Sequence, residues 1–135
     1  MNKTLILLVL VFALSMTLAG CGKPGPTTDL EVNMTEFTFT PAEFTIPAGE
    51  EITLTATNNG AVVHEFVIFK LGTDAGDHFG DEDEANIYWE MEALPGESKT
   101  LTFTAPGEPG AYYVTCRTEG HLEAGMSGEI IVVAE

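Results

Sequence analysis

Residues 112–128 read YYVTCRTEGHLEAGMSG, and they carry the most specific pattern in the chain. Cys116 follows a short run of aromatic and β-branched residues, His121 stands five positions later, and Met126 stands five positions after that. A glycine precedes each of the two later side chains. Because glycine adopts backbone turns that other residues resist, all three side chains can fold back towards one point.

A second histidine, His64, lies upstream among branched apolar residues in the run NGAVVHEFVI, residues 59–68. Thiolate and thioether sulfurs are soft ligands that suit Cu(I), and two histidines and one cysteine with a weak axial methionine form an electron-transfer copper site. Each side chain alone has a plainer explanation, such as a buried cysteine, a hydrogen-bonded core histidine, an exposed loop histidine or a core-filling methionine. The four together favour a copper centre, which would also hold the Cys116 thiol as a thiolate and protect it from oxidation.

The surrounding sequence is typical of short β-strands. Ile52, Leu54 and Ala56 alternate with threonines, and Leu101 and Phe103 do the same, which predicts one buried face for each strand. Turns rich in glycine, proline and asparagine separate the runs, and no helical period of comparable length follows residue 21. About eight short strands in roughly 105 residues predict an all-β fold, an eight-stranded antiparallel Greek-key β-sandwich. We expect the strands at residues 30–40, 43–47, 51–58, 62–70, 86–91, 98–104, 111–116 and 127–134.

One stretch, residues 72–84, breaks this rhythm with the sequence GTDAGDHFGDEDE. It is rich in glycine and aspartate and ends in a compact acidic run, Asp81 to Glu84. We expect a long, solvated connection between the two sheets. Calcium binding by these carboxylates is an alternative, although their spacing matches no full EF-hand loop.

The charge of the chain restricts its partners. The chain has 135 residues, with five basic residues against 21 acidic ones and a formal charge of −16. This length fits one domain and excludes a multidomain enzyme. Nucleic acid is not an expected partner, because neutralising phosphates requires clustered lysine and arginine. The negative charge favours cationic partners, with an attraction that weakens as salt rises.

The N-terminus has the layout of a secretory signal. Residues 1–20 carry a lysine near their start, at position 3. An apolar run follows that is short for a membrane span, and small residues end the segment. Leu18-Ala19-Gly20-Cys21 also resembles the lipobox of prokaryotic lipoproteins, in which the cysteine becomes the lipidated first residue. We therefore expect lipidation at Cys21, a flexible tether over residues 21–29 and a folded domain over residues 30–135. The alternative is an ordinary cysteine just past a plain signal.

Taken together, residues 30–135 resemble the cupredoxin family of type 1 blue copper proteins, whose members include plastocyanin and azurin. The resemblance implies an eight-stranded Greek-key β-sandwich with one copper ion at one end, held by His64, Cys116, His121 and Met126. The ligand loop is similar to those of the longer-loop members. The matching segments are Phe37–Phe39, Ile46–Glu50, Asn59–His64, Pro95–Glu97 and Gly125–Ile130.

Two positions depart from the pattern of many family members. Glu65 stands where an asparagine or serine commonly follows the first histidine, so the side-chain contact that pins the ligand loop is in doubt. Its backbone N–H could still donate to the sulfur of Cys116. Glu119 stands where a proline commonly precedes the glycine before the second histidine. This exchange would loosen the loop and put a charge beside His121.

These features predict one-electron transfer by a copper ion that cycles between Cu(II) and Cu(I). The family resemblance implies that His121 lies near the surface as the electron port, with Leu122 and Ala124 in the docking patch. We expect a monomeric domain, lipid-anchored on the extracytoplasmic face of a prokaryotic membrane, with redox partners such as a basic cytochrome. Copper delivery or storage is the alternative, followed by a metal-free adhesion or scaffold module. An enzyme such as a multicopper oxidase is not expected, since only His78 is left for a further site.

Overall fold

The computed structural model describes residues 25–134, which form nine β-strands and one short 3-10 helix, η1. The predicted signal of residues 1–20 and the predicted lipidation site, Cys21, lie outside the described residues. No helix within residues 25–134 combines the length and the apolar character needed to cross a membrane. The elements are β1 (Asp29–Thr35), β2 (Thr38–Thr40), β3 (Glu43–Pro47), β4 (Glu51–Asn58), β5 (His64–Phe69), η1 (Asp81–Asn86), β6 (Ile87–Ala93), β7 (Ser98–Thr104), β8 (Gly110–Thr115) and β9 (Ser127–Val133).

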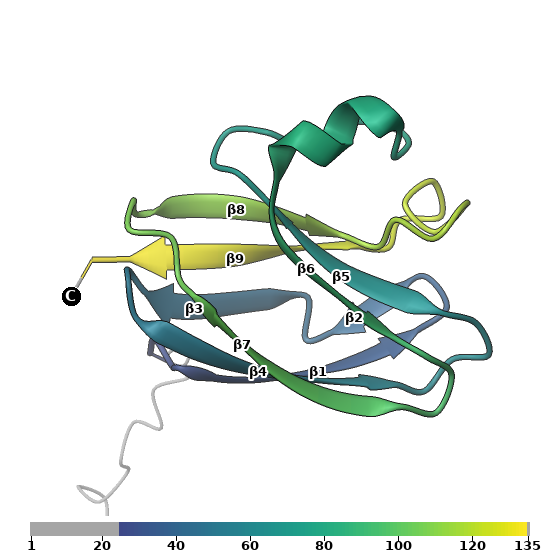
Figure 1. Cartoon of the computed structure of the whole chain (residues 1–135), viewed down its shortest axis with the longest axis horizontal. Helices are drawn as coiled ribbons and strands as arrows, with labels where there is room; N and C mark the ends of the chain where they lie inside the picture. The colour runs from purple at the N-terminus through teal and green to yellow at the C-terminus, as the bar shows by residue number, and fades with distance from the viewer. Residues whose placement is uncertain (1–24, 135) are drawn as a thin grey trace, which may run out of the picture.

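The strands form two sheets that pack face to face (Figure 1). One sheet has the order β2-β1-β4-β7 and the other the order β3-β9-β8-β5-β6. These orders contain the crossovers of a Greek-key sandwich, so the predicted all-β sandwich is confirmed. The expectation of purely antiparallel pairing is wrong, since β1 pairs with β4, and β3 with β9, in parallel.

The core lies between the sheets and follows the predicted alternation. Ile52, Leu54 and Ala56 of β4 are fully buried, as their spacing predicts. Phe103 of β7 is buried as well, and its ring stacks on Trp89 at 4.7 Å. Leu101 is 38% exposed instead, although it pairs with Leu54, because β7 is an edge strand and the opposite sheet does not cover this position.

The number of strands differs from the expected eight because residues 30–40 form a hairpin, not one strand. β1 and β2 pair antiparallel, with Thr35 opposite Thr38, so Glu36 and Phe37 make a two-residue turn. Phe37 has φ of 69°, the left-handed region that L-residues avoid. The sequence offers no glycine, proline or asparagine at this turn. The alternation of apolar and polar residues continues across it, so the sequence alone predicts one strand.

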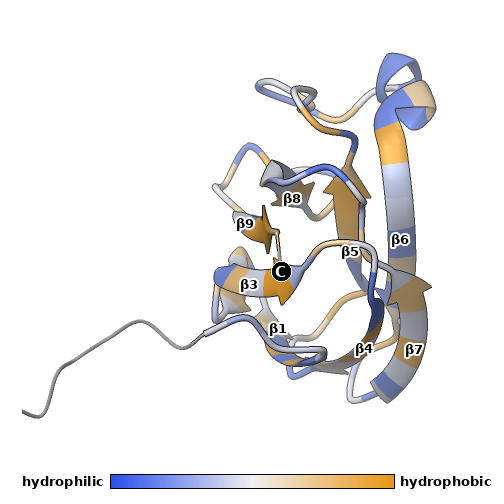
Figure 2. Ribbon diagram, turned by 90° about the vertical axis from the view of Figure 1, so that its left-hand side faces the viewer, coloured by the Kyte–Doolittle hydropathy of each residue, from blue (hydrophilic) through white to orange (hydrophobic). Residues whose placement is uncertain are grey.

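The acidic connection of residues 72–84 joins β5 to β6, which are neighbours in one sheet, so the expectation that it links the two sheets is wrong. It leads into η1, whose buried Asp83 accepts a hydrogen bond from the backbone N–H of Gly80 at 2.9 Å. The connection covers the outer face of the five-stranded sheet, where Val67, Phe69, Ala75 and Leu122 form a second hydrophobic cluster. β5 is therefore buried on both faces, which explains its nearly continuous hydrophobic character (Figure 2).

Candidate metal centre

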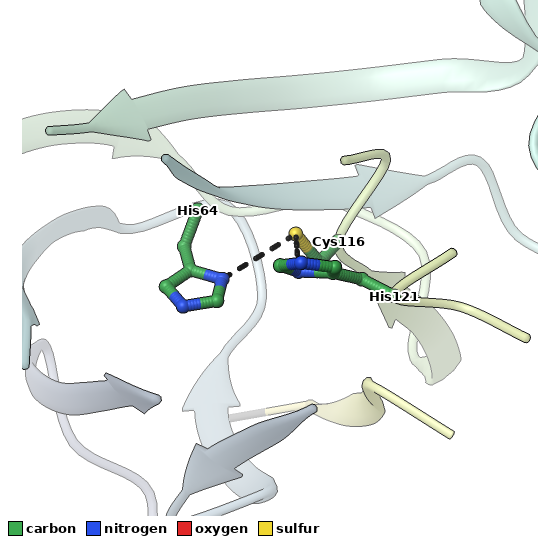
Figure 3. Close-up of side chains that lie close together, drawn as sticks. All are labelled: His64, Cys116 and His121. Carbon is green, nitrogen blue, oxygen red and sulfur yellow. Dashed lines mark hydrogen bonds between the residues drawn. The ribbon is translucent and has the colours of Figure 1, made fainter. Parts of the chain in front are cut away.

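Three side chains converge at one end of the sandwich from separate elements (Figure 3). His64 begins β5, Cys116 directly follows β8, and His121 lies in the loop before β9. The sulfur of Cys116 lies 3.9 Å from Nδ1 of His64 and 3.5 Å from Nδ1 of His121. All three residues are buried, and their ligand atoms lie within 4.8 Å of one another. Within residues 25–134, this is the one group of three or more His, Cys, Asp or Glu side chains placed to hold a metal ion.

Strand pairing brings the first two side chains together. β5 and β8 run antiparallel, with Val67 opposite Thr115, which sets the start of β5 beside the end of β8. The backbone N–H of Glu65 donates to the Cys116 sulfur at 3.4 Å, as expected from the sequence. This bond fixes the position of the sulfur at the end of β8.

The loop between β8 and β9 places the other side chains. Gly120 and Gly125 have φ of 81° and 95°, so both supply the turns expected of them. Met126 is fully buried in the same core cluster as Cys116. Its carbonyl accepts from the Cys116 N–H at 3.2 Å, and its own N–H donates to the carbonyl of His121 at 2.9 Å. The backbone therefore ties Met126 to both residues.

The electrostatics of the cluster favour a neutral imidazole at His64. Burial lowers the pKa of His64, and the nearby His121 ring, at a centroid distance of 4.8 Å, lowers it further. Glu36 acts in the opposite direction and raises the pKa. A neutral imidazole is the form that binds a metal. With both Nδ1 atoms facing the sulfur, the donor set is two imidazoles and one thiolate, which fits copper.

Glu65 pins the ligand loop by an ion pair. Its carboxylate contacts Nε of Arg117, the residue after Cys116. Nη1 of Arg117 also lies 3.1 Å from Glu84 of η1 and 3.0 Å from Glu90 of β6. The doubt that Glu65 raised about the pinning of this loop is resolved, since an ion pair takes the place of a neutral side-chain contact.

The pKa values of this pair reflect both burial and attraction. Burial alone would lower the pKa of Arg117, but the carboxylates of Glu65, Glu90 and Glu84 outweigh it and raise the pKa. Burial raises the pKa of Glu65, and Arg117 offsets part of that rise. The sequence analysis missed Arg117, whose signal was its place as the single arginine of an acidic chain, next to the cysteine.

The surroundings of His121 differ from the expectation. His121 is only 6% exposed, and the Phe37 ring contacts it edge-on at a centroid distance of 5.4 Å. Leu122 is buried in the second cluster, so its assignment to a docking patch is wrong, whereas Ala124 is exposed. Phe37, which is 47% exposed, covers His121 from the solvent side. Sequence reasoning missed this role because the contact depends on the hairpin turn.

Other exposed apolar side chains lie at the same end of the molecule. Val62 precedes the start of β5, and Leu94 follows the end of β6, where Ala93 pairs with His64. Asn58 joins the two segments, because its side-chain amide donates to the carbonyls of Val62 and Ala93 at 2.8 and 2.9 Å. Phe37, Val62 and Leu94, here called the apolar rim, are therefore exposed around the buried cluster.

Comparison with known proteins identifies the fold family. The family model described as a cupredoxin-like domain matches residues 4–132. Auracyanin-A of Chloroflexus aurantiacus is 28% identical over 95% of this chain and 96% of that protein. The copper-resistant cuproprotein CopI of Rubrivivax gelatinosus is 33% identical over 70% of this chain and 59% of that protein. Chloroplastic plastocyanin of Tetradesmus obliquus is 36% identical, over 70% of this chain and 57% of that one.

Solved structures give the same result. Reduced auracyanin from the photosynthetic bacterium Roseiflexus castenholzii superposes with a TM-score of 0.69 and 33% identity, over 81% of this chain and 99% of that one. Auracyanin A of Chloroflexus aurantiacus, a "blue" copper protein, superposes with a TM-score of 0.64 and 29% identity, over 81% of this chain and all of that one. Since the family model spans nearly the whole chain and the buried cluster has the matching chemistry, the protein belongs to the cupredoxin family, with a type 1 copper ion as its expected cofactor.

Proposed function

We propose that this protein is a type 1 blue copper electron carrier that passes single electrons between membrane-associated redox partners. The observation that carries the proposal is the buried sulfur of Cys116, flanked by Nδ1 of His64 and Nδ1 of His121 within 3.9 Å. These three atoms would hold the copper ion. Met126, fully buried and bonded through its backbone to Cys116 and His121, would supply the weak axial sulfur.

Bound copper would supply the chemistry, a one-electron change between Cu(II) and Cu(I). The chain's own residues would keep the positions of the ligands similar in both states. The Glu65 N–H holds the sulfur, and Arg117 ties the segment after Cys116 to β5, η1 and β6. The side chain of Thr118 donates to the carbonyl of Val63 at 2.9 Å, which attaches the loop to the start of β5. A site held this firmly needs little rearrangement when an electron enters or leaves.

The histidine content supports a carrier over an enzyme. The chain has three histidines, and two of them belong to the buried cluster. The third, His78, is exposed in the acidic connection, with Nε2 4.0 Å from Glu82. A multicopper oxidase needs further histidine-rich sites, and one exposed histidine does not supply them.

The charge of the chain supports a partner with a basic docking surface, such as a cytochrome. The formal charge is −16, and three carboxylates (Glu65, Glu84 and Glu90) share the single cation of Arg117, so negative charge is in excess beside the centre. The apolar rim of Phe37, Val62 and Leu94 offers a contact surface around His121 and His64. A lipid on Cys21 would hold the protein, as a monomer, on the extracytoplasmic face of a prokaryotic membrane.

Copper delivery or storage is the second candidate. It is favoured by the 33% identity to a copper-resistant cuproprotein, CopI. The two functions differ in what happens to the ion on reduction. A carrier keeps copper in both oxidation states, whereas a delivery protein releases it to an acceptor in one of them.

The test is voltammetry of the copper-loaded protein, combined with a chelator challenge of each oxidation state. A carrier gives a reversible one-electron wave and slow copper loss in both states. Replacement of His78 by Asn is the matched control, because it removes an exposed histidine and should change neither result. Rapid transfer of copper to the chelator from one state would favour delivery and contradict the carrier.

A further inference from the structure

The two residues of the β1–β2 turn each approach one histidine of the centre. Phe37 contacts the ring of His121, and Oε1 of Glu36 lies 3.8 Å from Nε2 of His64. The Glu36 side chain is 40% exposed, whereas that of His64 is fully buried. A carboxylate at the surface thus reaches a buried ligand from the side away from the sulfur.

Nε2 of His64 is a buried polar atom without a partner. Of the buried side-chain nitrogen and oxygen atoms within residues 25–134, it is the one that makes no hydrogen bond. Nδ1 faces the Cys116 sulfur, so a neutral imidazole that binds metal through Nδ1 carries its proton on Nε2. Leaving such a buried donor without an acceptor is destabilising. The Glu36 carboxylate is the acceptor that the structure holds nearby.

The carboxylate is aimed at this nitrogen by the loop after β4. Oε1 of Glu36 accepts a short hydrogen bond from the backbone N–H of Ala61, and this bond lowers the pKa of Glu36. The backbone N–H of the preceding residue, Gly60, donates to Oδ1 of the buried Asn58 at 2.8 Å. The loop after β4 is therefore fixed by the side chain of Asn58, and it holds the Glu36 carboxylate through the N–H of Ala61.

Gly60 makes the approach possible by its lack of a side chain. A Cβ at this position would lie 2.5 Å from both Oε1 of Glu36 and Nε2 of His64. The backbone of Gly60 is not among those with positive φ, so the conformation does not require glycine. What requires it is the space between the carboxylate and the imidazole.

We propose that Glu36 is a positioning residue for the copper centre: its carboxylate accepts a hydrogen bond from Nε2–H of His64 and lowers the reduction potential. Metal-binding histidines commonly donate their second N–H to a carboxylate, which fixes the ring and makes it a stronger electron donor. A negative charge behind the ligand also favours Cu(II) over Cu(I). Closing the gap from 3.8 Å to a normal hydrogen bond needs a movement of about 1 Å by an exposed side chain. This inference rests on the proposed copper function.

The first test is Glu36→Gln, which keeps the shape and removes the charge. We expect the variant to stay blue and to have a higher reduction potential. The ratio of Cu(I) to Cu(II) at a fixed solution potential should rise roughly fivefold, because a charge-assisted hydrogen bond is replaced by a neutral one. In the reduced, diamagnetic protein, the NMR signal of the His64 Nε2 proton should shift upfield and exchange faster with water.

The matched control is Glu31→Gln. Glu31 is an exposed residue of β1 that lies five positions earlier, about 16 Å away along the strand at ~3.3 Å per residue. The control variant removes the same charge from the same β1–β2 hairpin. If Glu36→Gln changes the potential and the proton signal no more than Glu31→Gln does, the role of Glu36 is refuted while the blue, reversible protein still supports electron transfer. A wild-type protein that is neither blue nor reversible would instead overturn the proposed function itself.

A second variant, Gly60→Ala, tests the same contact from the other side. The added methyl group would separate the carboxylate from the imidazole, so the potential should rise in the same direction. In the double variant with Glu36→Gln, the two effects should not add, because both remove one contact. Full additivity would contradict the proposal.

Discussion

Cys116 is fixed from three directions. The Glu65 N–H contacts its sulfur, the Met126 carbonyl accepts from its backbone, and Arg117 anchors the next residue to three carboxylates. The arginine matters beyond its own contacts, because without it Glu65, Glu84 and Glu90 would face one another uncompensated. Single residues next to the proposed ligands thus hold the centre in place.

Replacing Arg117 by Gln should lower the free energy of unfolding by about 1–3 kcal/mol, because a half-buried carboxylate loses its partner. Denaturant unfolding measures the change. Lys99→Gln is the matched control, since Lys99 is also cationic and its ammonium donates to the exposed backbone carbonyl of Glu92 at 3.0 Å instead of to a cluster of carboxylates. Equal losses in the two variants would argue against a special role for Arg117.

The copper-free protein should lose stability as pH falls through about 6.5. Burial lowers the pKa of His64 below its ordinary value of 6.5, so the unfolded chain binds a proton that the folded chain refuses. The free energy of unfolding therefore decreases with falling pH, by at most about 1.4 kcal/mol per pH unit for this group. His64→Gln should reduce the slope between pH 7 and 5. His78→Asn, which changes an exposed histidine, should leave it unaltered, and an equal effect of both would refute the assignment.

Among the elements that supply no ligand, the β1–β2 hairpin contacts both histidines of the centre. Its turn carries Glu36 to His64 and Phe37 to His121. Phe37 holds a left-handed backbone conformation that costs roughly 1–2 kcal/mol for an L-residue, and it is also exposed. An exposed aromatic ring kept at such a cost over His121 is suited to contact a redox partner.

Replacing Phe37 by Asn should separate stability from function. Asparagine tolerates the left-handed conformation, so the free energy of unfolding should stay the same or rise by about 1 kcal/mol. The rate of electron transfer to a cytochrome should fall, because the apolar rim loses the aromatic ring that contacts His121. Stopped-flow kinetics measures this rate. Leu101→Asn removes an exposed apolar residue of β7 as a control, and a similar drop in rate for both variants would deny Phe37 a specific role.

The sequence predicted the strands well where burial alternates, as in β4, because one face meets the core and the other meets water. It failed at the hairpin because Glu36 and Phe37 carry no turn signal, and the tertiary contacts of the turn override their local preferences. It also misjudged Leu101, since alternation shows which way a side chain faces but not whether anything covers it.

The cysteine and both histidines could be predicted from their chemistry and spacing, because a soft thiolate near two imidazoles is rare without a metal. Their supporting contacts could not be predicted. Arg117 meets Glu84 and Glu90 across 33 and 27 positions, and Glu36 meets His64 across 28. Such contacts depend on how strands pair, which no local pattern records.

The whole molecule is strongly acidic, with a formal charge of −16. Part of this charge lies beside the centre, where Glu65, Glu84 and Glu90 share the single cation of Arg117. Long-range attraction to a cationic partner would raise the rate of encounter and would be screened over about 10 Å at 0.1 M salt. The charge therefore affects the kinetics of partner binding more than the fold.

The rate of electron transfer to a basic cytochrome should fall steeply as ionic strength rises. Transfer to a small anionic oxidant should rise instead, because salt screens the repulsion. Stopped-flow rates measured over the same range of salt provide the comparison. The same trend for both reagents would mean that the net charge does not steer the encounter.

Whether this chain builds a blue copper centre can be decided by adding Cu(II) to the purified protein and recording its visible absorption and electron paramagnetic resonance spectra. We expect an intense blue colour and a narrow copper hyperfine splitting, both from a bond between copper and the Cys116 thiolate, and both lost in Cys116→Ser. A colourless product with an ordinary tetragonal copper signal would show that His64, Cys116 and His121 do not form a type 1 site.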